Sequence, residues 1–397
     1  MRQAWKWITI TLLAAAVVTL IVLLAIGSGN VESSSSSVLT TDLWQSFLKH
    51  YWLSEGRTVT DPNMSLTTSE GQSYTMLRAV WENDPKVFAS TWGWTKNNLQ
   101  LPDKLFAWQW GRNPNGTYGI MRADNGQNTA ADADSDIALA LIMAAHRWNK
   151  RSYLDQATAI VKSIWNTEVV QINGLYYLAA DNLEKTASTP YIVVNPSYFS
   201  PYAYRAFAAI DPTDNWNALA SDSYKEIETI SAAKLGSSQS DGLPPDWVII
   251  NRSTGQASAS PNKSLTTNFG FNAFRTIWRL ALDYKWNHTP AALATLRKFS
   301  FLYSQWQSNR KLYAIYNHSG QPAANYSSYA LYGGTLAYFQ LIHPSTVSAI
   351  LHSEIIKPLY NQENGSLKQT LDYYDNSWVW FGLMLQYNRL PNLVKGG

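Results

Sequence analysis

The sequence contains no cysteine, and this absence excludes disulfide bonds, thiolate nucleophiles and thiolate metal sites. Its six histidines show neither an HxxxH nor an HxH spacing, so the sequence predicts no metal site. Charge is also scarce, because only 15% of the residues are charged and the formal net charge is +3. Binding of nucleic acid requires a strongly basic stripe, so no nucleic-acid partner is expected.

Aromatic residues, in contrast, are abundant: 18 Trp, 23 Tyr and 12 Phe make up 13% of the chain. The apolar faces of pyranose rings stack on aromatic rings, and the sugar hydroxyls need polar partners around them. This composition is typical of a sugar-binding protein. It is equally compatible with a large helical core filled by aromatic side chains, and composition alone leaves both interpretations open.

The N-terminal segment predicts a membrane anchor. Residues 8–26 (ITITLLAAAVVTLIVLLAI) are uncharged and mostly apolar, and as a helix they would span roughly 28 Å, about the thickness of a hydrocarbon core. Arg2 and Lys6 precede them, which places residues 1–7 in the cytoplasm and the remainder outside a single-pass cell membrane protein. The alternative is a signal peptide cleaved near Ala25 and Gly27, although signal peptides have apolar regions of about 7–15 residues.

Beyond the anchor, residues 27–41 (GSGNVESSSSSVLTT) read as a Ser-rich linker, and we expect one folded domain over 42–397. Helical periodicity dominates this domain, over residues 43–53, 70–82, 85–99, 133–149, 153–166, 198–210, 214–233, 266–285, 290–306, 326–341, 344–358 and 369–387. Strand-like pieces are short, at 174–180 and 247–250. About twelve helices without a fixed-period repeat predict an all-α fold, in which six helical hairpins close into an (α/α)6 barrel rather than a solenoid.

Several predicted helices begin at residues that commonly serve as N-caps: Asp42, Ser69, Asp84, Thr213 and Thr289. Asp84 and Thr289 are each followed by a proline at the first helical position, which strengthens both predictions.

One helix start, TTSEGQSYTM, carries the single carboxylate Glu70 among small polar residues. A glutamate here can complement the helix dipole. The glutamate of a capping box, however, stands three residues after its serine, whereas Glu70 directly follows Ser69. A proton donor at the wall of a polar pocket is therefore the competing interpretation.

A second helix start, ADADSDIALALIMAAHRW, carries Asp132, Asp134 and Asp136 within five residues. On a helix Asp132 and Asp136 share a face, while Asp134 points elsewhere. One such aspartate suits a helix N-terminus, but three repel one another, which costs stability. The helical pattern leaves no room for the further ligands of a calcium loop, so a sugar-binding or acid–base role is preferred.

Together these stretches resemble glycoside hydrolase family 8, and in particular the secreted bacterial cellulases encoded with cellulose synthases. The motifs occur in the family's order over roughly residues 43–390: TTSEGQSYTM, FAWQWGR, ADADSDIALALIMAAHRW, VNPSYFSPYAY, PPDWV, FNAFRTIWRLALDYKW and YYDNSWVWFGL. The Asp-rich helix follows the family signature nearly throughout, with Ala131 where Ser or Thr is usual.

The resemblance implies an (α/α)6 barrel that hydrolyses a β-1,4-linked polysaccharide with inversion and without a metal or cofactor. Glu70 falls on the family's general acid, and we expect Tyr74, Trp108 and Trp110 around it to raise its pKa. Asp132 would hold the sugar at the cleavage site, with Asp134 close behind as a further contact.

The sequence departs from the family at the general base. Where the cellulase-like branch has the aspartate of a YDAxR motif, this chain reads FNAFR and places Asn272. An amide cannot accept the proton, so the base comes from elsewhere, the sugar differs, or the domain binds without cutting. Asp246, held between prolines and Trp247, is the preferred replacement, with Asp241 second and Asp372 or Asp375 as further alternatives.

Around this centre, Arg275 resembles a family arginine that lines the cleft, where its planar fork could orient Asn272 or a sugar hydroxyl. The stacking candidates are Trp108, Trp110, Tyr198 and Tyr202, while aromatic residues at 373, 374 and 378 have the helical spacing typical of a core.

The sequence therefore predicts a membrane-anchored, extracellular, inverting endo-glycosidase. It would trim an exopolysaccharide of the same cell's biofilm, with a polysaccharide synthase complex as a further partner. A catalytically degenerate polysaccharide-binding protein of the same fold is the alternative, and the sequence does not name the sugar.

Overall fold

The computed structural model describes residues 38–61, 63, 65–237, 239–361 and 363–394. The predicted anchor at 8–26 and most of the predicted linker therefore lie outside the described residues. Within the described residues, no helix combines the length and the hydrophobicity that crossing a bilayer requires. The folded domain begins before the expected residue 42, because a helix covers 38–51 and buries Leu39 and Thr40.

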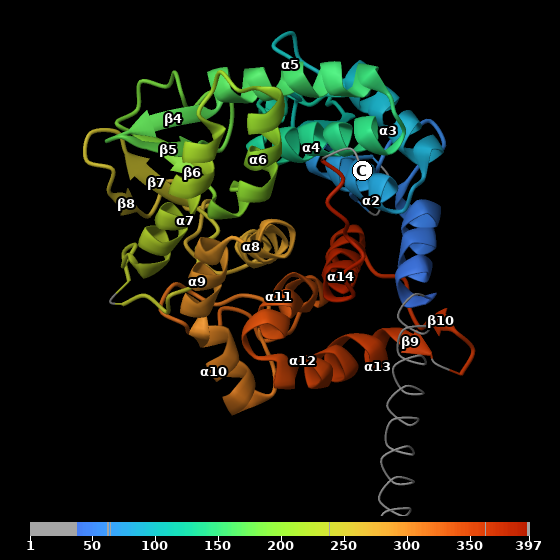
Figure 1. Cartoon of the computed structure of the whole chain (residues 1–397), viewed down its shortest axis with the longest axis vertical. Coiled ribbons are helices and arrows are strands. Elements are labelled where there is room, and N and C mark those ends of the chain that lie inside the picture. The colour runs from blue at the N-terminus through green and yellow to red at the C-terminus, as the bar shows by residue number, and fades with distance from the viewer. Residues whose placement is uncertain (1–37, 62, 64, 238, 362, 395–397) are drawn as a thin grey trace, which may run out of the picture.

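The helices form two layers, one inside the other (Figure 1). The inner layer contains α2 (Ser69–Trp81), α4 (Ala131–Arg147), α6 (Pro201–Ile210), α8 (Phe274–Asn287), α11 (Tyr329–Ile342) and α14 (Tyr373–Gln386). The outer layer contains the helix at 38–51, α3 (Pro85–Asn98), α5 (Arg151–Thr167), α7 (Trp216–Ala232), α9 (Pro290–Lys298), α10 (Ser300–Asn309), α12 (Pro344–Ile350) and α13 (Lys357–Leu359). This arrangement confirms the predicted (α/α)6-type fold.

Burial explains why each helix takes its layer. In α4 every residue from Ala131 to Ala145 is buried, and a helix that is buried all round belongs in the interior. In α5 the buried residues are Tyr153, Ala157, Ile160, Val161 and Ile164, a single stripe at helical spacing. Such a helix packs one face inward and leaves its charged face in water, so it belongs to the outer layer.

Short antiparallel sheets extend the loops that join the helices. Their strands are β1 (Thr67–Thr68), β2 (Gln109–Arg112) and β3 (Tyr118–Ile120); β4 (Val169–Ile172) and β5 (Leu175–Leu178); β6 (Tyr191–Val194), β7 (Val248–Asn251) and β8 (Ala257–Ser258); and β9 (Tyr360–Asn361) with β10 (Ser366–Leu367). The strand-like pieces predicted at 174–180 and 247–250 correspond to β5 and β7. The other strands have at most four residues, too few to reveal an alternating pattern.

Several predicted helices have different boundaries in the structure, and two examples show why. The helix expected over 266–285 begins only at Phe274, because the preceding backbone amides of Asn272 and Ala273 donate to the side chain of Asp246. The helix expected over 290–306 is divided into α9 and α10 at Phe299, whose backbone (φ −82°, ψ 40°) is not helical.

The caps are also partly corrected. Thr68, rather than Ser69, is the N-cap of α2, and its hydroxyl accepts the Gly71 N–H at 3.1 Å. The cap of α7 is Asn215 instead of Thr213, and Asp42 lies inside the first helix. Asp84 and Thr289 do occupy the N-cap positions of α3 and α9, and Asp84 accepts the Val87 N–H.

Candidate active site

Two inner helices, α4 and α8, face each other through paired charges. Asp132 and Asp136 are one turn apart on α4, and Arg275 and Arg279 are one turn apart on α8. Asp136 and Arg279 form a bidentate pair at 2.8 and 2.7 Å, and both are almost fully buried. Asp132 accepts from Arg275 at 2.8 Å, one turn closer to the helix N-termini. The predicted shared face of Asp132 and Asp136 is thereby confirmed.

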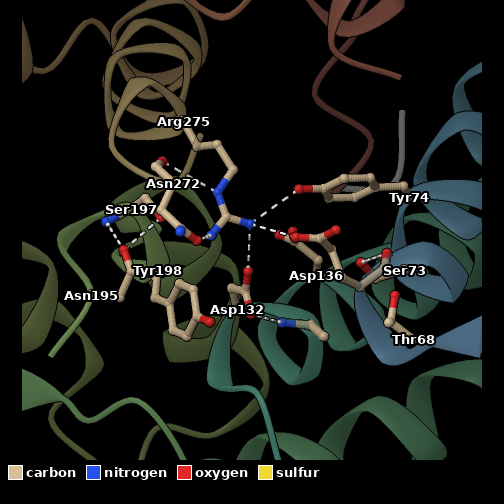
Figure 2. A network of polar contacts seen from close by, with 12 residues as sticks. Thr68, Ser73, Tyr74, Asp132, Asp136, Asn195, Ser197, Tyr198, Asn272 and Arg275 are labelled. Carbon is tan, nitrogen blue, oxygen red and sulfur yellow. Dashed lines mark hydrogen bonds and ion pairs between the residues drawn. The ribbon is translucent and has the colours of Figure 1, made fainter. Parts of the chain in front are cut away.

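Arg275 is the centre of the site (Figure 2). Its Nη1 donates to Glu70 Oε2 at 2.8 Å, to Asp132 Oδ2 at 2.8 Å and to the Tyr74 hydroxyl at 3.2 Å. Its Nη2 donates to Asn272 Oδ1 at 2.7 Å. One guanidinium therefore joins α2, α4 and the turn that precedes α8.

The surroundings of Glu70 raise the pKa of its carboxyl group. It stands in the first turn of α2, its side chain is 27% exposed, and the Tyr373 hydroxyl donates to its Oε1 at 3.3 Å. Burial raises the pKa of Glu70, and the nearby Asp132 carboxylate adds to that increase, while Arg275 opposes it. The net pKa is raised, which is the direction a general acid requires.

Asp132 is more deeply buried than Glu70, with a side chain that is 3% exposed. Its Oδ1 accepts the backbone N–H of Ala133 at 2.9 Å, which fixes the carboxyl plane against the helix start. Burial raises its pKa although Arg275 and Arg279 act in the opposite direction. Glu70 and Asp132 therefore share one cation, and neither is fully compensated by it.

The turn that carries Asn272 is held from behind by Asp246. Asp246 Oδ1 accepts the backbone N–H groups of Asn272 at 2.9 Å and Ala273 at 2.8 Å. A side chain at Gly270 would place its Cβ 2.7 Å from Asp246 Oδ2, so this close approach requires glycine. Burial raises the pKa of Asp246 to about 6, although these backbone amides oppose the increase.

Two cavities lie on either side of Arg275. The Glu70 cavity, of about 590 Å³, is lined by Glu70, Phe271, Asn272, Tyr326, Ser327, Ser328, Tyr329, Asp372, Tyr374 and Asp375. The Trp108 cavity, of about 640 Å³, is lined by Trp108, Asn128, Thr129, Ala130, Ala180, Asp181, Glu184, Val193, Tyr198, Trp247, Asn262, Ser264 and Leu265. Arg275 donates hydrogen bonds to Glu70 and Asn272, which line the Glu70 cavity. Its guanidinium carbon lies 5.4 Å from the ring centre of Tyr198, which lines the Trp108 cavity.

The structure places some of the predicted stacking residues at a cavity wall. Trp108 and Tyr198 both line the Trp108 cavity, and Trp247 packs edge-on against Tyr198 with ring centres 5.7 Å apart. These three rings come from separate segments, before β2, before α6 and before β7. Their arrangement gives the cavity the apolar surfaces that a sugar ring can stack on.

Three other predicted aromatic contacts are corrected. Tyr74 and Tyr202 are each only 1% exposed, so neither offers a ring face to a ligand. Tyr74 stacks on Tyr373 and accepts from Arg275, and Tyr202 accepts from Arg279 at 2.6 Å. Trp110 lines neither cavity and instead stacks on Tyr118, with ring centres 5.5 Å apart.

Asp134 is also corrected, because it cannot contact a sugar. Its side chain is fully buried, it faces away from Arg275, and Oδ1 accepts the backbone N–H of Phe106 at 2.9 Å. The neighbouring carboxyl group is that of Glu168. Residues two positions apart lie on different faces of a helix, so Asp134 is separated from Asp132 as expected. The sequence alone did not reveal that the Asp134 side chain points into the protein interior.

Sequence reasoning missed several residues of the Glu70 cavity. Phe271 and Tyr326 are 36% and 51% exposed, which is unusual for large aromatic side chains. Phe271 directly precedes Asn272, so its position was a usable signal, whereas Tyr326 comes from the loop before α11 and offered none. Asp372 and Asp375 line this cavity, whereas Asp132, Asp241 and Asp246 line neither cavity.

Comparisons with known proteins identify the family of this chain. Residues 13–378 match the glycosyl hydrolases family 8. This chain belongs to that family. An endoglucanase of Escherichia coli strain K12 is 31% identical over 248 residues, which is 61% of each chain. A probable endoglucanase of Novacetimonas hansenii is 30% identical over 289 residues, 70% of this chain and 78% of the relative.

Solved structures support the same assignment. The structure of the endo-1,4-D-glucanase from Vibrio fischeri superposes on this chain with a TM-score of 0.71 and 25% sequence identity. The superposition covers 87% of this chain and 94% of the glucanase. The chain is thus a homologue of endoglucanases. The match spans about six tenths of the length of the E. coli relative.

We expect the pKa of Glu70 to depend on the charge of Asp132. Asp132→Asn keeps an oxygen for Arg275 but removes a negative charge that raises the Glu70 pKa. The Glu70 pKa, followed by carbon-13 NMR of the labelled side chain, should therefore fall in this variant. Asp136→Asn is the matched control one turn deeper, and it should move the Glu70 pKa less. An equal or larger Glu70 shift in the control would contradict the described coupling.

Proposed function

We propose that this protein is an inverting, endo-acting glycoside hydrolase that cleaves a β-1,4-linked polysaccharide. The observation that carries the proposal is Glu70: a carboxyl with a raised pKa that lines an open cavity while Arg275 holds it in place. Open cavities on both sides of the centre suit an enzyme that binds a chain along its length. The printed names of the relatives, endoglucanase and endo-1,4-D-glucanase, agree with this reaction.

In the proposed mechanism Glu70 protonates the leaving glycosidic oxygen. At the same time a base takes a proton from a water molecule, whose oxygen attacks the anomeric carbon from the opposite ring face as the glycosidic bond breaks. The two carboxyls of inverting enzymes lie about 6.5–9.5 Å apart. Asp132, fixed by Arg275 and the Ala133 amide, would hold the sugar at the cleavage point. Because Arg275 orients both carboxyls, the proton donor Glu70 and the sugar-contacting Asp132 are held in a fixed position relative to each other.

Asp246 is the proposed base. Asn272 stands at the position where a carboxylate would be expected, and Asp246 contacts the backbone of that residue directly. A pKa of about 6 lies close to the range in which a general base works near neutral pH. Asp372 and Asp375 are the competing bases, because they line the same cavity as Glu70.

A second candidate function is polysaccharide binding without hydrolysis. Asn272 favours it, because its amide oxygen accepts from Arg275 and cannot take a proton from water. The raised pKa of Glu70 opposes it, since a binding protein has no use for a proton donor.

The decisive experiment measures reducing ends released by the full chain from β-1,4 glucans, xylans, chitosans and the producer's own matrix. Glu70→Gln should lower the rate by about 10²–10⁴-fold, the usual contribution of a general acid. Asp246→Asn should cause a similar loss while keeping an Oδ1 acceptor for the Asn272 and Ala273 amides.

Asp372→Asn and Asp375→Asn serve as the matched variants for the competing bases and should retain activity. If Asp246→Asn keeps full activity and one of these two does not, Asp246 is the wrong base. If the wild type cuts nothing, binds one glycan, and gains hydrolysis through Asn272→Asp, the binding function replaces the enzymatic one.

The charge of the cavity walls predicts selection against anionic glycans. Glu70, Asp372 and Asp375 line one cavity, Asp181 and Glu184 line the other, and neither lining includes Lys, Arg or His. Binding of hydroxyethylcellulose and carboxymethylcellulose to inactive Glu70→Gln compares one backbone with and without charge. We expect tighter binding of the neutral polymer, with a difference that shrinks as salt screens the repulsion. Tighter binding of the anionic polymer would refute this.

We further propose that the domain is anchored in the cell membrane, faces outward and trims an exopolysaccharide made by the same cell, beside its synthase. The apolar residues 8–26 behind Arg2 and Lys6 support the anchor. Fractionation of producing cells should recover the full-length chain in the membrane pellet, and deletion of residues 1–26 should move it to a soluble fraction. Recovery of the wild-type chain only from the culture medium, shortened at its N-terminus, would contradict the anchor.

A further inference from the structure

A buried pair of carboxyl groups lies behind the active-site wall and takes no part in the proposed chemistry. Asp134 in α4 and Glu168, which follows the last residue of α5, are both fully buried. Their side chains contact each other at hydrogen-bonding distance. Asp103 and Asp181, two other charged groups that act on the pair, are also acidic and raise its pKa values further.

The hydrogen bonds of the pair leave one oxygen of each carboxyl without a donor. Asp134 Oδ1 accepts the Phe106 N–H, and Glu168 Oε1 accepts the Thr129 hydroxyl. Asp134 Oδ2 and Glu168 Oε2 are buried, and no described residue donates to either oxygen. Two ionised carboxylates in this position would repel each other in a medium of low dielectric constant. A single proton between the two oxygens removes the repulsion and satisfies both of them.

The groups that hold the pair come from the wall of the Trp108 cavity. Thr129, which donates to Glu168, lines that cavity and is tied in turn to Asn182 by two hydrogen bonds, at 3.0 and 3.2 Å. The next residues along the chain start α4, where the Ala131 N–H donates to Ala180 O at 3.1 Å. Asp132 follows directly, so Asp134 and the carboxyl proposed to contact the sugar lie in the same helical turn.

We infer that Asp134 and Glu168 share one proton and act as positioning residues, which lock the first turn of α4 and the adjoining wall of the Trp108 cavity. The pair joins the loop before β2, the start of α4 and the end of α5 through Phe106, Thr129 and their own contact. Ionisation of both carboxyls removes the shared hydrogen bond and introduces repulsion. The wall of the Trp108 cavity then becomes less rigid, and Asp132 is held less firmly in its position.

The pH range follows from the raised pKa values. Burial raises the pKa of Glu168 to about 8 and that of Asp134 well above its ordinary value. The unfolded chain releases the same proton near pH 4. Between these values the folded state binds more protons than the unfolded state, so stability falls as pH rises through this range. The contribution is complete in acid, is reduced as pH passes the Glu168 pKa of about 8, and is lost fully only when the higher pKa of Asp134 is also passed.

The first test is infrared difference spectroscopy of the full chain, wild type against Asp134→Asn and Glu168→Gln. Because the pKa of Glu70 is also raised, the measured quantity is the un-ionised carboxyl band that the wild type shows at neutral pH in excess of each variant, and each variant should lack this excess band. Asp124→Asn, at an exposed carboxyl, is the control and should leave the band unchanged. A band that persists in both pair variants would overturn the inference, because the proton would then reside elsewhere.

The second test compares thermal unfolding of the same proteins over the same pH range. In Asp134→Asn an amide N–H can donate to Glu168 at every pH, so this variant should lose less stability than the wild type from neutral to alkaline pH. Asp134→Ala, which breaks the contact, should be less stable throughout. A constant difference between wild type and Asp134→Asn at all pH values would contradict a shared proton.

A third measurement addresses the positioning role through binding of a β-1,4 gluco-oligosaccharide to proteins that also carry Glu70→Gln. Affinity should fall above about pH 8 with the wild-type pair and stay level with Asp134→Asn. An identical fall in both proteins would refute the link to the cavity. The infrared and unfolding measurements require no substrate, so their outcome is independent of whether the proposed hydrolysis is correct.

Discussion

The site depends on one buried guanidinium group that two carboxyls share. Arg275 Nη1 lies 2.8 Å from both Glu70 and Asp132, and all three side chains come from inner helices whose ends meet at this point. A positive charge shared in this way stabilises each carboxylate only in part, while burial disfavours the ionised form of both. The pKa values of Glu70 and Asp132 are therefore raised in spite of the salt bridges. The same contact that fixes the geometry leaves a proton available.

One turn deeper the same residue types form a different kind of contact. Asp136 and Arg279 make a bidentate pair, supported by the hydroxyls of Ser200 and Tyr202 at 2.7 and 2.6 Å. Such a pair holds two helices in register, and removal of one partner would leave a buried charge. The Arg275–Asp132 pair lies next to residues that line the cavities, and the Arg279–Asp136 pair keeps α4 and α8 aligned one turn deeper.

Asn272 changes the charge balance of this centre more than its shape. Its amide oxygen accepts from Arg275 at 2.7 Å, a contact that a carboxylate could make equally well. An aspartate there would be a third anion around one guanidinium, whereas asparagine leaves the cation to Glu70 and Asp132. Asp246 supports the turn from behind, with no side chain at Gly270 to keep it away. The amide thus preserves the architecture of the turn while the proton acceptor has to lie outside it.

The sequence by itself determined the helical ring and the positions of Glu70 and Asp132 at helix starts, because periodicity, caps and the order of motifs are local properties. It also predicted that Asp132 and Asp136 share a face. Only the tertiary structure decided that Asp134 is buried beside Glu168. The same holds for the hydroxyls of Tyr74 and Tyr202, which accept hydrogen bonds from Arg275 and Arg279. It also holds for Phe271 and Tyr326, which line the Glu70 cavity. Exposure of a side chain depends on which distant segments pack against it, and the spacing of residues along one helix does not contain that information.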